Sequence, residues 1–73
     1  MLATWTIRNV GNLGKNLRAA RKKLRLSQEE VAARSGLEQG EVSRIERGLR
    51  DPQVSTLEKL AAAVEVPPGR LLD

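Results

Sequence analysis

Apolar residues recur at intervals of three and four along most of this chain, which is the spacing of one face of an α-helix. The first stripe predicts a helix over about 13–24, with Asn12 as a candidate N-cap. The last stripe predicts a helix that begins between positions 53 and 55 and ends near 64. The residues predicted to face inward are Leu13, Leu17, Ala20 and Leu24; Val42, Ile45 and Leu49; and Val54, Leu57, Leu60, Ala61 and Val64.

Cap residues divide the stretch 26–48 into two short helices. Ser27 and Glu30 have the capping-box spacing, in which the serine hydroxyl accepts the backbone N–H of Glu30 and the glutamate reaches back. Gly36 suits the left-handed residue found just past a helix end. The second helix is predicted to start at Glu38 and to continue to about residue 48. So short a turn makes the two helices cross steeply, which leaves the outer face of the second helix uncovered.

Two further signals complete the predicted helices. Pro67 and Pro68 open a last short helix over 69–73, because proline suits the first turn of a helix. Ser55 and Glu58 repeat the S-x-x-E spacing at the start of the helix before it. The pattern therefore predicts five short helices around a core of Leu, Val, Ile and Ala.

Taken in order, these residues resemble the helix-turn-helix of the phage repressor and Cro family, also called the XRE family. The resemblance covers 13–73 and implies an all-α fold, a compact five-helix, lambda-repressor-like DNA-binding domain. Arg25 stands where the family often has glycine, and a left-handed conformation there would cost of order 1 kcal/mol. The matching residues of the motif are Ser27-Gln28-Glu29-Glu30-Val31-Ala32, Gly36-Leu37 and Val42-Ser43-Arg44-Ile45-Glu46-Arg47-Gly48.

The domain is predicted to occupy 12–73, with the helix-turn-helix motif at 27–47. Residues 1–11 lie outside the resemblance and contain Thr, Trp, Ile and Val, which favour extended structure. We expect an N-terminal arm or short strand there, and a disordered leader is the alternative. Trp5, the only aromatic residue, is expected to pack on the domain or on a second copy.

Composition narrows the range of functions. A domain of 73 residues buries only about 60% of the surface of its unfolded chain, so oligomerisation is one route to stability. The formal net charge of +4 suits an anionic partner. The chain has no histidine, cysteine or tyrosine, so neither an enzyme, a metal site nor a cofactor is expected. No apolar run approaches the roughly 20 residues that span a bilayer, and no signal peptide is recognisable. We expect a cytoplasmic protein with no membrane or small-molecule partner.

The resemblance implies that the second helix of the motif enters the major groove of double-stranded DNA. Gln39, Gly40, Ser43 and Arg44 then occupy the base-facing positions. Gln39 can bridge N6 and N7 of adenine, and Arg44 can bridge O6 and N7 of guanine. Gly40 has no side chain where relatives often read a base, and inside a helix it costs roughly 1 kcal/mol relative to alanine.

Other residues are predicted to contact the DNA backbone. The start of the first motif helix offers backbone N–H groups to phosphate, and Gln28, which stands there, is also expected to support Gln39. The full predicted set is Ser27, Gln28, Glu38, Arg47 and Arg50. Glu38 and Glu41 add negative charge to this end, where acids favour a helix N-terminus.

Two further groups carry structural predictions. The family pairs an arginine of the first helix with a glutamate at the end of the third, which implies an Arg21–Glu46 pair that orients the reading helix. The apolar residues left over at the two ends, Trp5, Val66 and Leu72, are candidates for a dimer surface, while Leu71 anchors the last helix to the core.

The function predicted on these grounds is a sequence-specific DNA-binding transcriptional regulator that binds an inverted repeat as a homodimer. The alternative is a protein-interaction or antitoxin-type module that keeps the fold with weak DNA binding, as Glu38, Glu41 and Gly40 would suggest.

Overall fold

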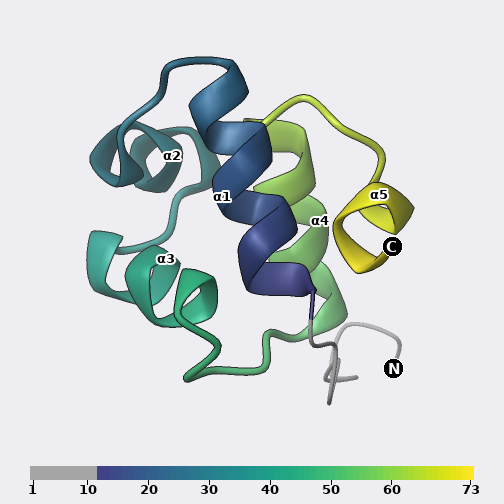
Figure 1. The fold of residues 1–73 in the computed structure, drawn as a ribbon. Coiled ribbons are helices and arrows are strands. Elements are labelled where there is room, and N and C mark those ends of the chain that lie inside the picture. The colour runs from purple at the N-terminus through teal and green to yellow at the C-terminus, as the bar shows by residue number, and fades with distance from the viewer. Residues whose placement is uncertain (1–11) are drawn as a thin grey trace.

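The computed structural model describes residues 12–73, in which five helices follow one another (Figure 1). Their bounds are α1 Leu13–Lys23, α2 Gln28–Ser35, α3 Gln39–Glu46, α4 Val54–Ala63 and α5 Pro68–Leu72. The predicted all-α, five-helix fold is confirmed. The expectations for Trp5 and the rest of 1–11 lie outside the described residues.

Two helices form the centre of the domain, and the other three lie on either side of them. In Figure 1, α1 and α4 occupy the middle, α2 and α3 lie on one side and α5 lies on the other. α1 contacts both α3 and α5, and α4 contacts both α2 and α5. α3 therefore projects from the side of the domain opposite α5.

Each helix contributes to one hydrophobic core. The largest fully buried side chains come from the predicted stripes, from Val31 of α2 and from the anchor of α5: Leu17, Val31, Val42, Ile45, Leu60, Val64 and Leu71. Ala20 and Leu24 are partly buried against this core, and Val54 is half-buried at the start of α4. The three- and four-residue spacing thus identified most of the core correctly.

Leu49 is the exception, because it is 66% exposed instead of facing inward. α3 ends at Glu46, and Gly48 adopts a left-handed conformation with φ of 74°. The N–H of Gly48 donates to Ile45 O and that of Leu49 to Arg44 O, which is a Schellman ending. The chain therefore turns away from the core one residue before Leu49.

The same ending closes α1 around a residue that carries a side chain. Arg25 has φ of 57°, and the N–H groups of Arg25 and Leu26 donate to Lys22 O and Arg21 O. Leu26, the residue after the turn, is buried. Burial of Leu26 offsets the strain of a left-handed arginine, which is of order 1 kcal/mol.

Two predicted N-caps differ from the structure. Asn12 stands at the N-cap position of α1 but makes no capping hydrogen bond; its Nδ2 donates to the backbone oxygen of Asp73 instead. The N-cap of α4 is Gln53, so Ser55 lies inside that helix and the S-x-x-E spacing with Glu58 is not a capping box.

Candidate nucleic-acid interface

α3 has one face committed to the core and one face in solvent. Val42 and Ile45 are 0% and 1% exposed and fix the inner face. Gln39, Gly40 and Arg44 are exposed, and Ser43 is half-buried. The four predicted base-facing residues therefore lie on the surface that the core does not use.

The turn between α2 and α3 keeps that surface open. Gly36 ends α2 with φ of 77°, as predicted, and the N–H of Leu37 donates to Ala32 O. Leu37 packs against the core next to the start of α3. The two helices contact each other along their inner faces, so no described element covers the outer face of α3 (Figure 1).

Glu41, Arg44 and Arg50 form a charged cluster on α3 and the loop after it, and the sequence analysis did not predict this cluster. Arg44 Nη1 lies 3.6 Å from Glu41 Oε1, and Arg50 Nε lies 3.2 Å from Glu41 Oε2. A Cβ added to Gly40 would lie 3.5–3.8 Å from the guanidinium atoms of Arg44, so that guanidinium covers Gly40. The three-residue spacing of Glu41 and Arg44 could have signalled their pairing. Nothing local in the sequence signals the contact to Arg50, which comes from the loop after α3.

The capping box of α2 occupies two of the backbone N–H groups at the start of that helix. Ser27 Oγ accepts the N–H of Glu30, and Glu30 Oε1 accepts the N–H of Ser27. The pKa of Glu30 is lowered first by the backbone N–H of Ser27 and then by the Ser27 side chain, which hydrogen-bond its carboxylate. Of the four N–H groups without helical partners, those of Gln28 and Glu29 are left for an anion.

Gln28 does not support Gln39 in the way predicted. Its Nε2 donates to Glu46 Oε1 at 3.1 Å, which directs the amide toward the end of α3. The prediction was wrong because the buried carboxylate of Glu46 lies within reach of α2 and accepts this bond. A phosphate contact of Gln28 would have to use its remaining amide hydrogen or its backbone N–H.

Glu46 is the meeting point of three helices. Arg21 Nε and Nη2 donate to its two oxygens at 2.7 and 3.0 Å, and the side chains of Arg21 and Glu46 are only 12% and 4% exposed. The hydrogen bond to Glu46 raises the pKa of Arg21. Gly14 allows this approach, since a Cβ there would overlap the carbonyl oxygen of Glu46. The structure thus contains the Arg21–Glu46 pair expected from the sequence.

The remaining predicted phosphate contacts, Glu38, Arg47 and Arg50, are all exposed. Glu38 stands at the N-cap of α3 but its side chain makes no capping hydrogen bond there. Arg47 occupies the other end of α3 as its C-cap residue. Two cations and one acid therefore flank the reading helix, and the acid lies nearer its N-terminus.

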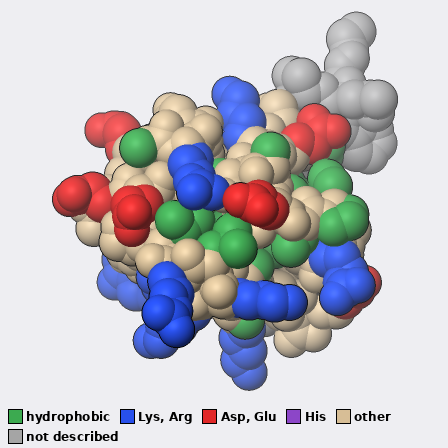
Figure 2. Space-filling view, turned by 90° about the horizontal axis from the view of Figure 1, so that it is seen from above, with side chains coloured by type: hydrophobic (Ala, Val, Ile, Leu, Met, Phe, Trp, Pro, Cys, Tyr) green, Lys and Arg blue, Asp and Glu red, His purple; other side chains and the backbone are tan. Residues whose placement is uncertain are grey.

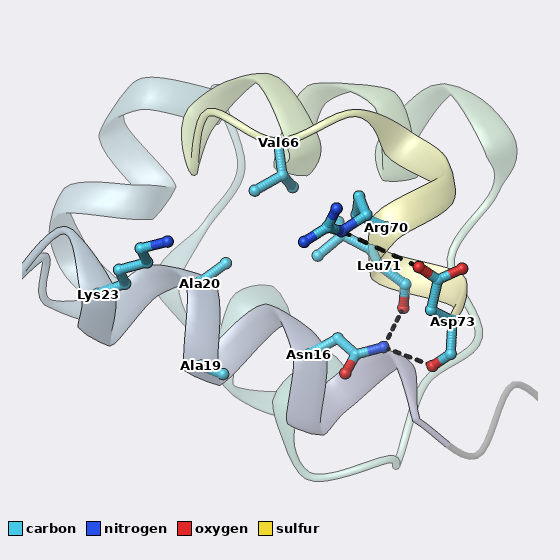
Figure 3. Close-up of a pocket in the computed structure, with 8 residues that line it drawn as sticks. All are labelled: Asn16, Ala19, Ala20, Lys23, Val66, Arg70, Leu71 and Asp73. Atoms are coloured by element: carbon cyan, nitrogen blue, oxygen red, sulfur yellow. Dashed lines mark hydrogen bonds and ion pairs between the residues drawn. The ribbon is translucent and has the colours of Figure 1, made fainter.

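The opposite end of the domain holds Val66 and Leu72, the two predicted dimer residues that lie within 12–73. Val66 and Leu71 line a hollow of about 420 Å³ between α1 and α5, as Figure 3 shows. Asn16 closes one side of it and donates to the backbone oxygens of Leu71 and Asp73. Leu71 is buried, whereas Leu72 is 37% exposed. Of the predicted dimer residues at this end, Leu72 is accessible and Val66 is partly accessible.

Charge and apolar area are unevenly distributed over the surface. On the face in Figure 2, hydrophobic side chains gather in the middle, several Lys and Arg side chains lie along one edge with others elsewhere on the face, and acids lie at both sides and near the centre. The exposed bases of α1 are Lys15, Arg18, Lys22 and Lys23. Within 12–73, no acidic cluster could hold a metal ion, and no helix of this part of the chain has the length and apolarity to cross a membrane.

Five helices around a helix-turn-helix with an open second helix define a DNA-binding domain of the repressor type. The chain belongs to the helix-turn-helix family, whose sequence profile matches residues 17–71. The resemblance to XRE-type regulators is thereby confirmed. A family of DNA-binding regulators also agrees with the expectation that the chain is not an enzyme.

Similar proteins extend this assignment. The HTH-type transcriptional regulator y4dJ of Sinorhizobium fredii is 48% identical over 54 residues, covering 74% of this chain and 70% of that one. The restriction-modification controller protein C.AhdI of Aeromonas hydrophila is 35% identical with a TM-score of 0.82, covering 89% of this chain and 98% of that chain. SinR, a master regulator for biofilm formation solved in complex with DNA, is 34% identical with a TM-score of 0.79, covering 84% and 98%.

The chain spans only 28% of the length of another regulator of Sinorhizobium fredii that it matches, y4dL. The domain itself is a DNA-binding domain of a transcriptional regulator.

Proposed function

We propose that this protein is a sequence-specific transcriptional regulator of the cytoplasm that inserts α3 into the major groove of an inverted repeat. Gln39, Gly40, Ser43 and Arg44 face the bases, and Arg47 and Arg50 meet the flanking phosphates. The N–H groups of Gln28 and Glu29 receive a third phosphate at the start of α2, where the helix dipole favours an anion.

One observation carries this proposal: α3 is anchored by Val42 and Ile45 while its Gln39 and Arg44 remain exposed. Those two side chains have the hydrogen-bonding geometry to read adenine and guanine. The DNA complex of the similar protein SinR supports the same use of this fold.

A protein-interaction module with weak DNA binding is the second candidate, and the acids of α3 were its main support. The structure weakens that support, because Glu41 is balanced by Arg44 and Arg50. Of Glu38 and Glu41, only Glu38 has no cation partner among the ion pairs of the described residues.

The regulator is proposed to act as a homodimer. A single reading helix covers too few base pairs to select one site, and two-fold proteins of this class bind half-sites one helical turn, roughly 34 Å, apart. A self-complementary patch of Leu72 and Val66 would supply the two-fold contact, with Trp5 as a further candidate.

An affinity comparison tests the base-reading role. DNA selected in vitro by the protein gives its preferred site, and binding is then measured on that site and on random DNA. Arg44→Ala is expected to weaken binding to the selected site by about 1–3 kcal/mol more than binding to random DNA.

Arg47→Ala is the matched control, because it removes the same charge from a predicted phosphate contact. Its loss is expected to be equal on both DNAs and to reduce the salt dependence of the affinity. If Arg44→Ala also lost affinity equally on both, Arg44 would be a phosphate contact and the proposed base reading would be wrong.

A further inference from the structure

Glu41 holds two arginines that come from different parts of the predicted DNA surface. Arg44 belongs to the last turn of α3, and Arg50 belongs to the loop that follows it. The distances from the carboxylate are 3.6 Å to Arg44 Nη1 and 3.2 Å to Arg50 Nε. The side chain of Glu41 is 22% exposed, against 52% for Arg44 and 58% for Arg50. The acid is therefore the fixed member of the cluster, and the two bases extend from it into solvent.

The contacts leave both arginines able to bind DNA. At 3.6 Å the Arg44 contact is longer than a hydrogen bond, so the donors of its guanidinium are not consumed. Arg50 meets Glu41 through Nε, which leaves its two terminal nitrogens to face a phosphate. The Arg44 guanidinium also lies beside Gly40, since a Cβ added there would be 3.5–3.8 Å from its atoms, so it has a neighbour within α3 besides Glu41.

We propose that Glu41 is a positioning residue that joins Arg44 and Arg50 into one preorganised unit, so that base reading and phosphate contact occur together. This inference rests on the proposed function. Without the carboxylate, two like charges repel each other and both long side chains must be ordered when DNA binds, and that ordering reduces affinity for the correct site. Glu41 then contributes specificity although its own charge opposes DNA.

The first experiment compares Glu41→Gln with the parent on the selected site and on random DNA. The variant keeps the shape of the side chain and removes its charge. The ratio of the two affinities is expected to fall about three- to tenfold, the effect of ordering one or two side chains. Binding to random DNA is expected to stay equal or to strengthen, because the net charge of +4 rises by one.

Glu58→Gln is the control for net charge. Glu58 is an exposed acid of α4, and its neutral variant is expected to preserve the affinity ratio. If Glu41 were only an opposing charge, Glu41→Gln would strengthen binding to both DNAs equally and leave the ratio unchanged. That result would overturn the inference while the proposed function stood.

A second measurement does not require the Glu41 variant to fold. In the protein with Glu41 intact, the single variants Arg44→Ala and Arg50→Ala and the double variant are each measured on the selected site. The sum of the affinity losses of the two single variants is then compared with the loss of the double variant. Because both arginines share one carboxylate, the losses are expected to be non-additive. Additive losses would overturn the inference, and a parent with no preferred sequence would refute the proposed function and the inference together.

Discussion

Arg21 of α1 and Glu46 of α3 form a two-point ion pair, with Nε–Oε2 and Nη2–Oε1 distances of 2.7 and 3.0 Å. Arg21 Nη1 also donates to Leu26 O, and Gln28 donates to the same carboxylate from α2. One nearly buried carboxylate therefore ties the C-terminal end of the reading helix to the two helices before it.

Glu46→Ala is expected to destabilise the fold by about 3–5 kcal/mol, because it leaves the nearly buried Arg21 charge without its partner. Thermal and urea unfolding measure the loss. The control is Asp73→Asn, which removes a fully solvent-screened partner 4.0 Å from Arg70; exposed pairs contribute about 0–1 kcal/mol. Equal stability of the Glu46 variant and the parent would show that the pair does not hold α3.

Gly14→Ala is also expected to destabilise the fold. The new Cβ would overlap Glu46 O and lie 2.8 Å from Ile45 O. Because both are backbone atoms, α1 and α3 must move apart, at a cost of about 1–3 kcal/mol. Over most of that range the cost exceeds the roughly 1 kcal/mol that alanine gains over glycine in a helix.

Gly69→Ala supplies the matched control in α5. A Cβ at Gly69 meets no atom within 4 Å, so the helix preference of alanine is expected to act alone and leave stability equal or higher. If both variants had the same unfolding midpoint, the close approach at Gly14 would not determine how α1 and α3 pack.

The features predicted correctly from the sequence depend on short stretches of chain. The capping box of Ser27 and Glu30 and the left-handed Gly36 involve groups within four residues of each other. The helical stripes likewise follow from the three- and four-residue repeat. These local signals correctly predicted the five helices and the exposed face of α3.

Most of the errors came from groups brought together by the fold, and one came from a local turn. Gln28 donates to Glu46 across 18 positions, and Asn12 donates to Asp73 across 61. Leu49 had the spacing of an inward residue, but the turn at Gly48 directs it outward. The ion pair between Glu41 and Arg50 depends on the path of the loop after α3, and no local sequence pattern specifies that path.

Acid is expected to unfold the protein partly through Glu30. Hydrogen bonds from the Ser27 backbone and hydroxyl lower its pKa below the ordinary value of 4.5. A carboxyl group whose pKa is lower in the folded state than in the unfolded state stabilises the folded state at pH values above the unfolded pKa. This contribution is lost as the pH falls through the lower, folded-state pKa. Stability therefore decreases below about pH 4.5.

Glu30→Gln isolates this effect, because glutamine also serves in a capping box but does not titrate. Melting temperatures of the parent and the variant are measured from neutral pH down into acid. The parent is expected to lose more stability than the variant, and only in the acid range. Parallel curves at all pH values would contradict a linkage through Glu30.

The last prediction concerns assembly through the end of the domain opposite α3. Leu72 is one of two large hydrophobic residues exposed within 12–73, and the other is Leu49. Leu72 is the last residue of α5, and its neighbours Leu71 and Asp73 line the same hollow as Val66 (Figure 3). If this patch joins two copies, Leu72→Glu places two like charges near the two-fold axis. Sedimentation is expected to show a dimeric parent and a monomeric variant, with equal helical content by circular dichroism because Leu72 is not part of the buried core.

Leu49→Glu, at the more exposed position beside the reading helix, is expected to stay dimeric without DNA. A parent that is monomeric at high micromolar concentration, with or without an inverted repeat, would contradict the dimer and favour the interaction module.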